Sequence, residues 1–207
     1  MKTVHFGNWI ALLMVLFVSA CSNPAGDVTP AAVSDAPAGG NEVMHGTKYA
    51  IAETSTISFI GSKVTGSHDG GFKKFEGELH VVGDAIATIK GKVVIDMKSV
   101  WTDTNRLTGH LMTADFFEVE KHPTATFTCS SVKMKGDQTT VSGTLDLHGV
   151  TRAVEFPATI AKAGDEFTLQ AEFKIKRFDW GIVYKGQADN LIYDDVVIKL
   201  DLKAAKA

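Results

Sequence analysis

Alternation of apolar and polar residues with a period of two is the feature that most constrains the fold of this chain. In the run Glu166–Lys176, apolar side chains fall at every second position and polar or charged ones lie between them. Successive residues of a β-strand point to opposite faces, so this pattern predicts a strand with one apolar and one solvated face. The same pattern predicts strands at 89–97, 141–148 and 195–202, and further strands near 57–64, 75–82, 125–132 and 153–160.

Glycine-containing turn signals separate these predicted strands. The pairs are Gly70-Gly71, Gly83-Asp84, Gly136-Asp137 and Gly164-Asp165. Short connections join antiparallel neighbours, so about eight antiparallel strands are expected. One apolar face for each strand fits either a closed barrel or a sandwich. A barrel of this strand number is wide enough to enclose one small ligand.

One stretch between two predicted strands breaks the alternation. Leu107 and Leu111 are spaced i,i+4, which places them on one face of a helix. Asp103 or Thr104 can cap the start of this helix, and Pro123 ends the segment. We therefore expect a short helical insertion around 104–118, and insertions of this kind often carry functional residues.

The N-terminus has the features of a leader for export. Lys2 precedes an uncharged apolar block at Trp9–Val18, and Ser19, Ala20 and Cys21 follow directly. The block is too short to cross a bilayer, which needs roughly 20 apolar residues, but it suits a signal peptide. The end of the block resembles a bacterial lipobox. Residues 1–20 are therefore expected to be a signal peptide, with Cys21 lipidated as the first mature residue. The alternative is an ordinary signal peptide in which a cysteine stands there by coincidence.

The residues after Cys21 predict a tether and a location. Residues 22–46 contain three of the five prolines and many small residues, so 21–46 should form a flexible tether to the membrane. The folded domain is then expected at 47–207. Ser22 stands where aspartate would retain a lipoprotein in the inner membrane of enteric bacteria. This favours a cell-envelope lipoprotein in the outer membrane, facing the periplasm.

Charge and cysteine content exclude other classes. With 21 basic and 24 acidic residues and no basic run, the chain offers no nucleic-acid-binding surface. If Cys21 bears lipid, Cys129 is left without a disulfide partner. Its alternating surroundings favour a buried, inert thiol over a nucleophile.

An ordered set of short motifs resembles the YceI-like proteins. The central block comprises Arg106, His110-Leu111, Asp115-Phe116-Phe117, Pro123 and Phe127. It is flanked by Phe59, Gly71-Phe72 and Phe75-Glu76-Gly77 before it, and by Gly143-Thr144-Leu145, His148-Gly149-Val150-Thr151, Arg177-Phe178-Asp179-Trp180-Gly181 and Asp195-Val196-Val197-Ile198 after it.

This resemblance implies an all-β fold, an antiparallel eight-stranded barrel similar to the lipocalins. It implies an apolar channel that holds a polyisoprenoid, a quinone or another amphiphilic lipid, with no other cofactor. Members of the family are typically periplasmic or secreted and often dimeric, so a homodimer is one expected partner. The channel residues would be Phe59, Phe72, Phe75, Leu111, Phe116, Phe117, Phe127 and Trp180.

Alternatives remain for these residues. The aromatic set equally fits ordinary core packing. Arg106, His110 and Asp115 fit three roles: they pin the insertion, they bind a lipid head group at a polar mouth, or His110 acts as a general base.

Neither a nucleophile motif nor close histidine spacing is present, so no enzyme activity and no metal site are predicted. His122 is expected in a loop, and Arg177 should pair with Asp179.

The predicted function is binding, sequestration or transport of an amphiphilic lipid in the envelope. The alternatives are an enzyme that uses His110 on a lipid head group, and a structural or stress-related lipoprotein with a filled barrel.

Overall fold

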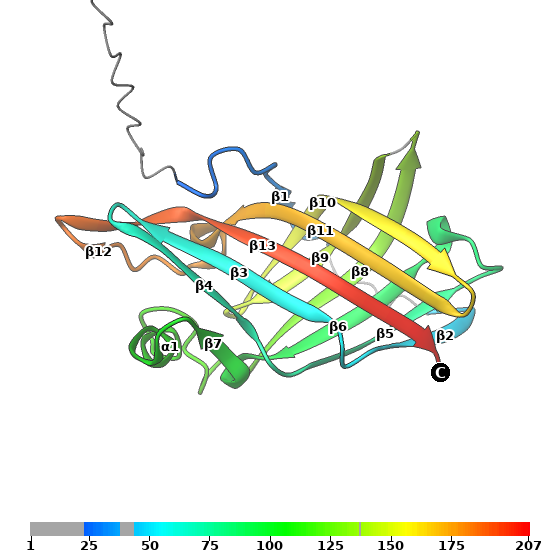
Figure 1. The fold of residues 1–207 in the computed structure, drawn as a ribbon, viewed down its shortest axis with the longest axis horizontal. Coiled ribbons are helices and arrows are strands. Elements are labelled where there is room, and N and C mark those ends of the chain that lie inside the picture. Colours follow the sequence, from blue (N-terminus) through cyan, green and yellow to red (C-terminus); the bar gives the residue numbers. More distant parts are fainter. Residues whose placement is uncertain (1–22, 38–43, 137) are drawn as a thin grey trace, which may run out of the picture.

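The computed structural model describes residues 23–37, 44–136 and 138–207, and shows a closed antiparallel barrel (Figure 1). The leader and the lipidation site predicted at 1–21 lie outside the described residues. The strands are β1 (Ala32–Asp35), β2 (Thr47–Ile51), β3 (Thr56–Lys63), β4 (Gly66–Phe72), β5 (Phe75–Val81), β6 (Lys90–Asp96), β7 (Val100–Thr102), β8 (Thr124–Lys135), β9 (Gln138–Leu147), β10 (Val150–Ala163), β11 (Glu166–Lys176), β12 (Gly186–Gln187) and β13 (Asn190–Lys206). The helices are α1 (Asn105–Leu111) and the 3-10 turns η1 (Ile86–Thr88), η2 (Met97–Ser99) and η3 (Arg177–Trp180).

The barrel closes through the long C-terminal strand. Hydrogen bonds join β10, β9, β8, β6, β5, β2, β13 and β11 in that order, and β11 returns to β10. Some staves of the barrel consist of two strands separated by a short break. Strand β13 pairs with β3 and then, near its end, with β2, so β2 and β3 form one continuous line. Strands β4 and β5, and strands β6 and β7, follow each other in the same way. The predicted eight-stranded barrel is confirmed, and the ring of pairs decides against a sandwich.

The alternation in the sequence sets the inside and the outside of the barrel. Along β11, Phe167, Phe173 and Ile175 are buried, whereas Glu166 and Glu172 between them are exposed. Each buried aliphatic or aromatic side chain contributes about 1.5–3 kcal/mol relative to an exposed one. The apolar faces of all the strands therefore hold the barrel together from within.

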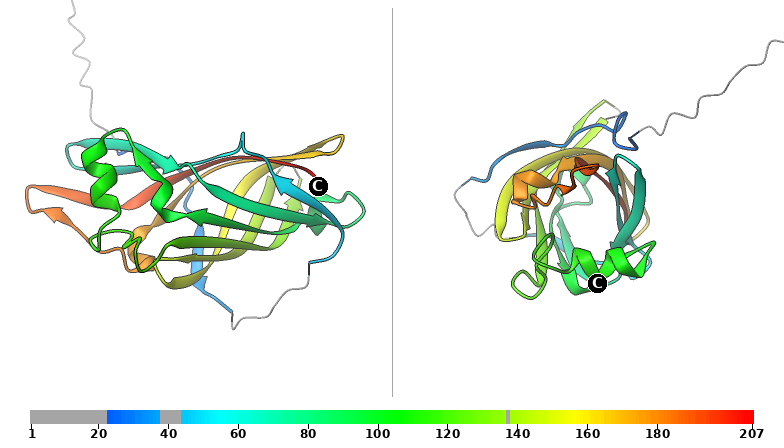
Figure 2. Two further views of the ribbon diagram at one scale, coloured as in Figure 1. Left: turned by 90° about the horizontal axis from the view of Figure 1, so that it is seen from below. Right: turned by 90° about the vertical axis from the view of Figure 1, so that its left-hand side faces the viewer.

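The predicted short helical insertion is confirmed. Helix α1 ends at Leu111, and the rest of the insertion to residue 118 is a series of turns. Gly109 weakens the helix, and the backbone amides of Phe117 and Glu118 bond to the carbonyls of Leu111 and Thr113 in turns. Figure 2 shows α1 at the rim of one end of the barrel. Of the helices in the described part of the chain, none has the length and apolar character needed to cross a membrane.

Residues 23–37, which are part of the tether predicted over 21–46, pack on the barrel and do not extend from it. Strand β1 is paired to β10, and Ala25 is fully buried. The backbone of residues 29–31 bonds to Lys174 of β11, and Asp35 pairs with Arg152 of β10. The prediction missed this strand because its backbone hydrogen bonds come from distant strands and not from its own composition.

Candidate functional site

An apolar cavity of about 220 Å³ lies inside the barrel. Its walls come from residues that face inward on most strands, such as Ile57, Ile95, Leu145 and Ile198. A second cavity, of about 70 Å³, follows it inside the barrel. The two share the lining residues Val93, Phe127, Phe156, Leu200 and Leu202. Two apolar spaces that meet at shared walls form an elongated hollow.

Six of the eight predicted channel residues line the larger cavity. They are Phe59, Phe72, Leu111, Phe116, Phe117 and Phe127. Their contact with a ligand stays a prediction. Ring contacts connect Phe59 to Phe72 and Phe72 to Phe117, with ring centres 5.8 and 6.0 Å apart. Aromatic side chains thus link the β3–β4 wall to the loop beyond α1.

The other two predicted channel residues do not line this cavity. Phe75 directly follows the break between β4 and β5, and it borders an outer groove among charged side chains. Trp180 is fully buried, and its indole Nε1 donates to the Leu145 carbonyl at 3.2 Å. The sequence pattern missed this because η3 turns Trp180 out of the strand alternation and into the core.

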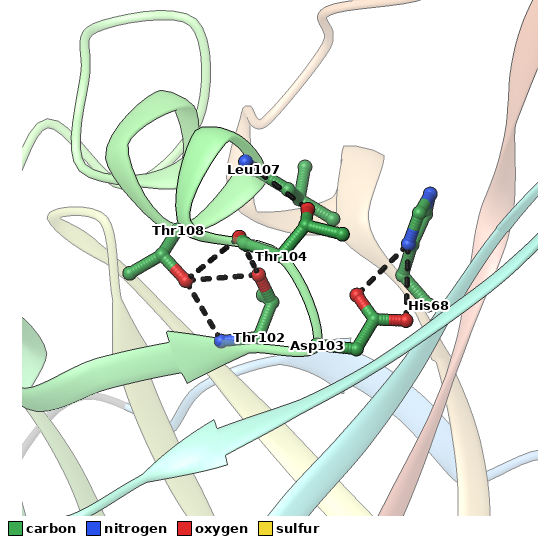
Figure 3. A network of polar contacts seen from close by, with 6 residues as sticks. All are labelled: His68, Thr102, Asp103, Thr104, Leu107 and Thr108. Atoms are coloured by element: carbon green, nitrogen blue, oxygen red, sulfur yellow. Dashed lines mark hydrogen bonds and ion pairs between the residues drawn. The ribbon is translucent and has the colours of Figure 1, made fainter.

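Threonine side chains fix helix α1 against the barrel (Figure 3). The Thr104 hydroxyl accepts a hydrogen bond from the Leu107 amide at 3.4 Å and caps the helix. The Thr108 hydroxyl accepts from the Thr102 amide at 2.9 Å, and His68 contacts Asp103 at 2.9 Å. Strands β4 and β7 and the loop between β7 and α1 therefore hold the helix where Leu111 meets the cavity.

The predicted polar mouth is only partly assembled. His110 Nε2 lies 2.8 Å from Asp115 Oδ2, and the His110 ring packs edge-on against Phe116 and Tyr184. Arg106 is exposed and forms no ion pair with the part of the chain that the structure describes. None of the three predicted mouth residues lines the cavity. The pair His110–Asp115 instead supports Phe116 from behind.

Arg177 is the charged side chain that does line the cavity. It is 5% exposed, and its guanidinium donates to the carbonyls of Ile182 at 2.6 Å and Tyr193 at 3.1 Å. Burial lowers the pKa of the Arg177 guanidinium, and the Asp194 carboxylate opposes that shift. The predicted ion pair with Asp179 does not form, because both residues lie in η3 and not on one strand face.

Two histidines that are far apart in the sequence meet at the end of the barrel near α1. The ring centres of His122 and His148 are 4.7 Å apart, and Glu118 lies beside both. His122 lies in a loop, as predicted. The spacing rule for metal sites missed this group because its members come from a loop and a turn that only the fold brings together.

Cys129 has the buried position that its strand pattern predicted. It is 7% exposed, and its Sγ lies 3.8 Å from the Ile89 carbonyl oxygen. A thiol in such apolar surroundings is shielded from solvent and packs as a small hydrophobic side chain.

Comparison with known proteins identifies the family. The family model for the YceI-like domain matches residues 49–204. The chain belongs to the YceI-like family. Protein YceI of Escherichia coli O6:H1 is 38% identical over 119 residues, which cover 55% of this chain and 62% of that protein. Protein YceI of Salmonella arizonae is 37% identical over the same shares. The chain thus spans less than two thirds of the length of these relatives.

Solved structures of the YceI-like fold agree with the barrel. BcnA of Burkholderia cenocepacia superposes with a TM-score of 0.68 at 24% identity, covering 75% of this chain and 99% of BcnA. A polyisoprenoid-binding domain from Saccharophagus degradans has a TM-score of 0.64 at 21% identity, covering 78% of this chain and 99% of that domain. At these identities the likeness shows the fold alone.

Proposed function

We propose that this YceI-like protein binds one amphiphilic lipid, of the isoprenoid or quinone class, with its apolar chain inside the barrel. The observation that carries the proposal is the elongated apolar hollow with a buried cation, Arg177, in its wall. Burial of apolar surface supplies about 25 cal/mol for each Å², so a chain within these walls would bind without any covalent step. The domain from Saccharophagus degradans, described as polyisoprenoid-binding, is consistent with this ligand class.

Arg177 indicates where the ligand's oxygen atoms would lie. Three backbone carbonyls, those of Ile182, Ile192 and Tyr193, accept from its guanidinium, which has five N–H donors. A phosphate or quinone oxygen at this point of the wall would accept a charge-assisted hydrogen bond from the remaining donors. This assigns the head group to Arg177, in place of the mouth expected from Arg106, His110 and Asp115.

The proposal is tested by the lipid that the protein retains. A protein that begins at Ser22 keeps the barrel and the segment packed on it but lacks the lipidation site at Cys21. It can therefore be produced in a bacterial periplasm and purified without detergent. We expect mass spectrometry of a solvent extract to find one isoprenoid or quinone species near one per chain. An Arg177→Met variant should lose about tenfold in affinity for a prenyl phosphate and keep its affinity for the prenol of equal length. A protein that retains no lipid and rejects both added prenyl compounds would exclude the proposed function.

The envelope location rests on the leader and Cys21 and is likewise a proposal. The structure describes the chain from Asn23 onward, and two residues of extended chain reach at most about 7 Å. A lipidated Cys21 would therefore hold the barrel against the membrane surface and not at the end of a long tether. Mass spectrometry of the N-terminal peptide from membrane-extracted protein should find an acylated Cys21, and a peptide that retains residues 1–20 would contradict this.

A further inference from the structure

We propose that Glu118, His122 and His148 form a binding site for one divalent transition-metal ion such as Zn²⁺. Glu118 and His122 lie in the loop between α1 and β8, and His148 lies in the turn between β9 and β10. The candidate ligand atoms of the three residues all lie within 4.8 Å of one another. This inference concerns a separate group of side chains, and it does not depend on the proposed lipid.

The distances are close to those of a metal site. Glu118 Oε2 lies 3.7 Å from His122 Nε2 and 3.9 Å from His148 Nε2. In a tetrahedral zinc site, metal–ligand bonds of about 2.0–2.1 Å place neighbouring ligand atoms roughly 3.3–3.5 Å apart. The two distances from Glu118 exceed this spacing by about half an ångström, and the two imidazole nitrogens, which lie within 4.8 Å of each other, would also move closer together to bind one ion. Two imidazoles and one carboxylate also leave a fourth position open for water or another ligand.

The surroundings of His148 prepare its Nε2 atom to bind a metal. Its Nδ1 lies 3.2 Å from the backbone carbonyl oxygen of Trp180. A carbonyl only accepts hydrogen bonds, so this contact places the proton on Nδ1 and leaves a lone pair on Nε2. That Nε2 atom is buried and has no hydrogen-bond partner. Metal-binding histidines commonly have this arrangement, in which the second ring nitrogen donates to a carbonyl or carboxylate.

The backbone around the cluster is held in uncommon conformations. Glu118 and His148 have φ values of 46° and 54°, in the left-handed region that non-glycine residues rarely occupy. Gly149 has a φ of 74°, and a Cβ atom there would lie 2.7 Å from His122 Cε1. The turn therefore needs glycine at 149 for the two imidazoles to approach, and the cluster depends on locally strained backbone.

One neighbouring cation competes for the carboxylate. Lys121 Nζ lies 3.4 Å from Glu118 Oε2, but the Lys121 side chain is 67% exposed. Exposed ion pairs of this kind contribute little to stability, so the lysine can move away when a metal ion binds. The bound ion would then link the loop that carries Phe116 and Phe117 to the β9–β10 turn.

The site is tested with Co²⁺ and Zn²⁺ on the chain from Ser22 onward, prepared without a histidine tag and stripped with a chelator. We expect one Co²⁺ per chain with the visible absorption of a four-coordinate site, displaced by one equivalent of Zn²⁺. Loss of a group that only hydrogen-bonds to a metal ligand weakens metal binding about 10–100-fold, so removing a ligand itself by Glu118→Gln or His122→Ala should weaken it by at least about 100-fold. Glu118→Gln preserves the shape of the side chain, so a loss there does not depend on misfolding.

His68→Ala is the matched control, because His68 also contacts a carboxylate, that of Asp103, away from this cluster. This variant should bind Co²⁺ like the wild type. Metal binding that survives both Glu118→Gln and His122→Ala, or the absence of stoichiometric binding in the wild type, would overturn the proposal. Neither result depends on whether the barrel holds a lipid.

Discussion

Substituting phenylalanine for Val93 should reduce lipid retention at least about tenfold while the barrel still folds. Val93 is 8% exposed, lies in β6 and lines both cavities, so a larger side chain there would obstruct the point where they meet. Excluding about 60 Å² of ligand surface costs about 1.5 kcal/mol, which corresponds to a tenfold loss of affinity. The added ring enters existing space, so its overpacking cost should lie at or below the usual 1–3 kcal/mol.

The adjacent residue provides the control for this substitution. Val94 follows Val93 in β6, faces the other side of the sheet and borders the outer groove. Val94→Phe adds the same atoms at the neighbouring position but should leave the retained lipid unchanged. Solvent extraction and mass spectrometry of both variants, with thermal unfolding to confirm the fold, make the comparison. Equal retention by the wild type and both variants would mean that the lipid does not occupy the hollow.

Trp180→Ala should lower the free energy of unfolding by about 3–5 kcal/mol. Trp180 is 0% exposed, so its removal leaves a cavity among buried side chains and leaves the Leu145 carbonyl without its donor. For a domain of this size the loss corresponds to a fall of roughly 10 °C in Tm, which thermal and denaturant unfolding would both detect. Because Trp180 lies outside the cavity, the fraction that stays folded should still retain lipid.

Phe178→Ala is the comparison for Trp180→Ala. Phe178 lies in the same η3 turn, but it is 38% exposed and covers the Arg177 guanidinium from outside, 4.6 Å from the ring centre. Its loss should cost about 1–2 kcal/mol, because the cation–π contact joins a half-exposed ring to a buried guanidinium. If the two substitutions destabilise the protein equally, Trp180 is not the packing centre that the structure indicates.

The alternation of residue types predicted the class of fold and most of the cavity wall. In β11 and β13 the inward residues could be assigned from the sequence because a strand repeats every two residues, so each apolar position implies its face. Phe59, Phe72 and Phe127 were predicted to line a channel from the family resemblance, and they do line the cavity. Thr104 was likewise recognisable as one of two candidate helix caps from its position before the leucine pair.

The errors fell where the chain leaves this regular pattern. Trp180 and Arg177 lie in the 3-10 turn η3. The tryptophan was expected to line the channel and is buried in the core instead, and the arginine was expected to pair with Asp179 and lines the cavity instead. Phe75 lies directly after a break between two strands, so the two-residue period of β4 could not predict which face of the sheet its side chain occupies.

The sequence by itself determined that this chain forms antiparallel strands with one apolar face, because that pattern depends only on neighbouring residues. The tertiary structure alone decided which distant segments meet. It placed β1 on β10 and residues 29–31 beside β11, and it brought His122 beside His148 and Glu118. Such contacts depend on barrel closure and on turns, whose geometry arises from hydrogen bonds between strands that are remote in the sequence.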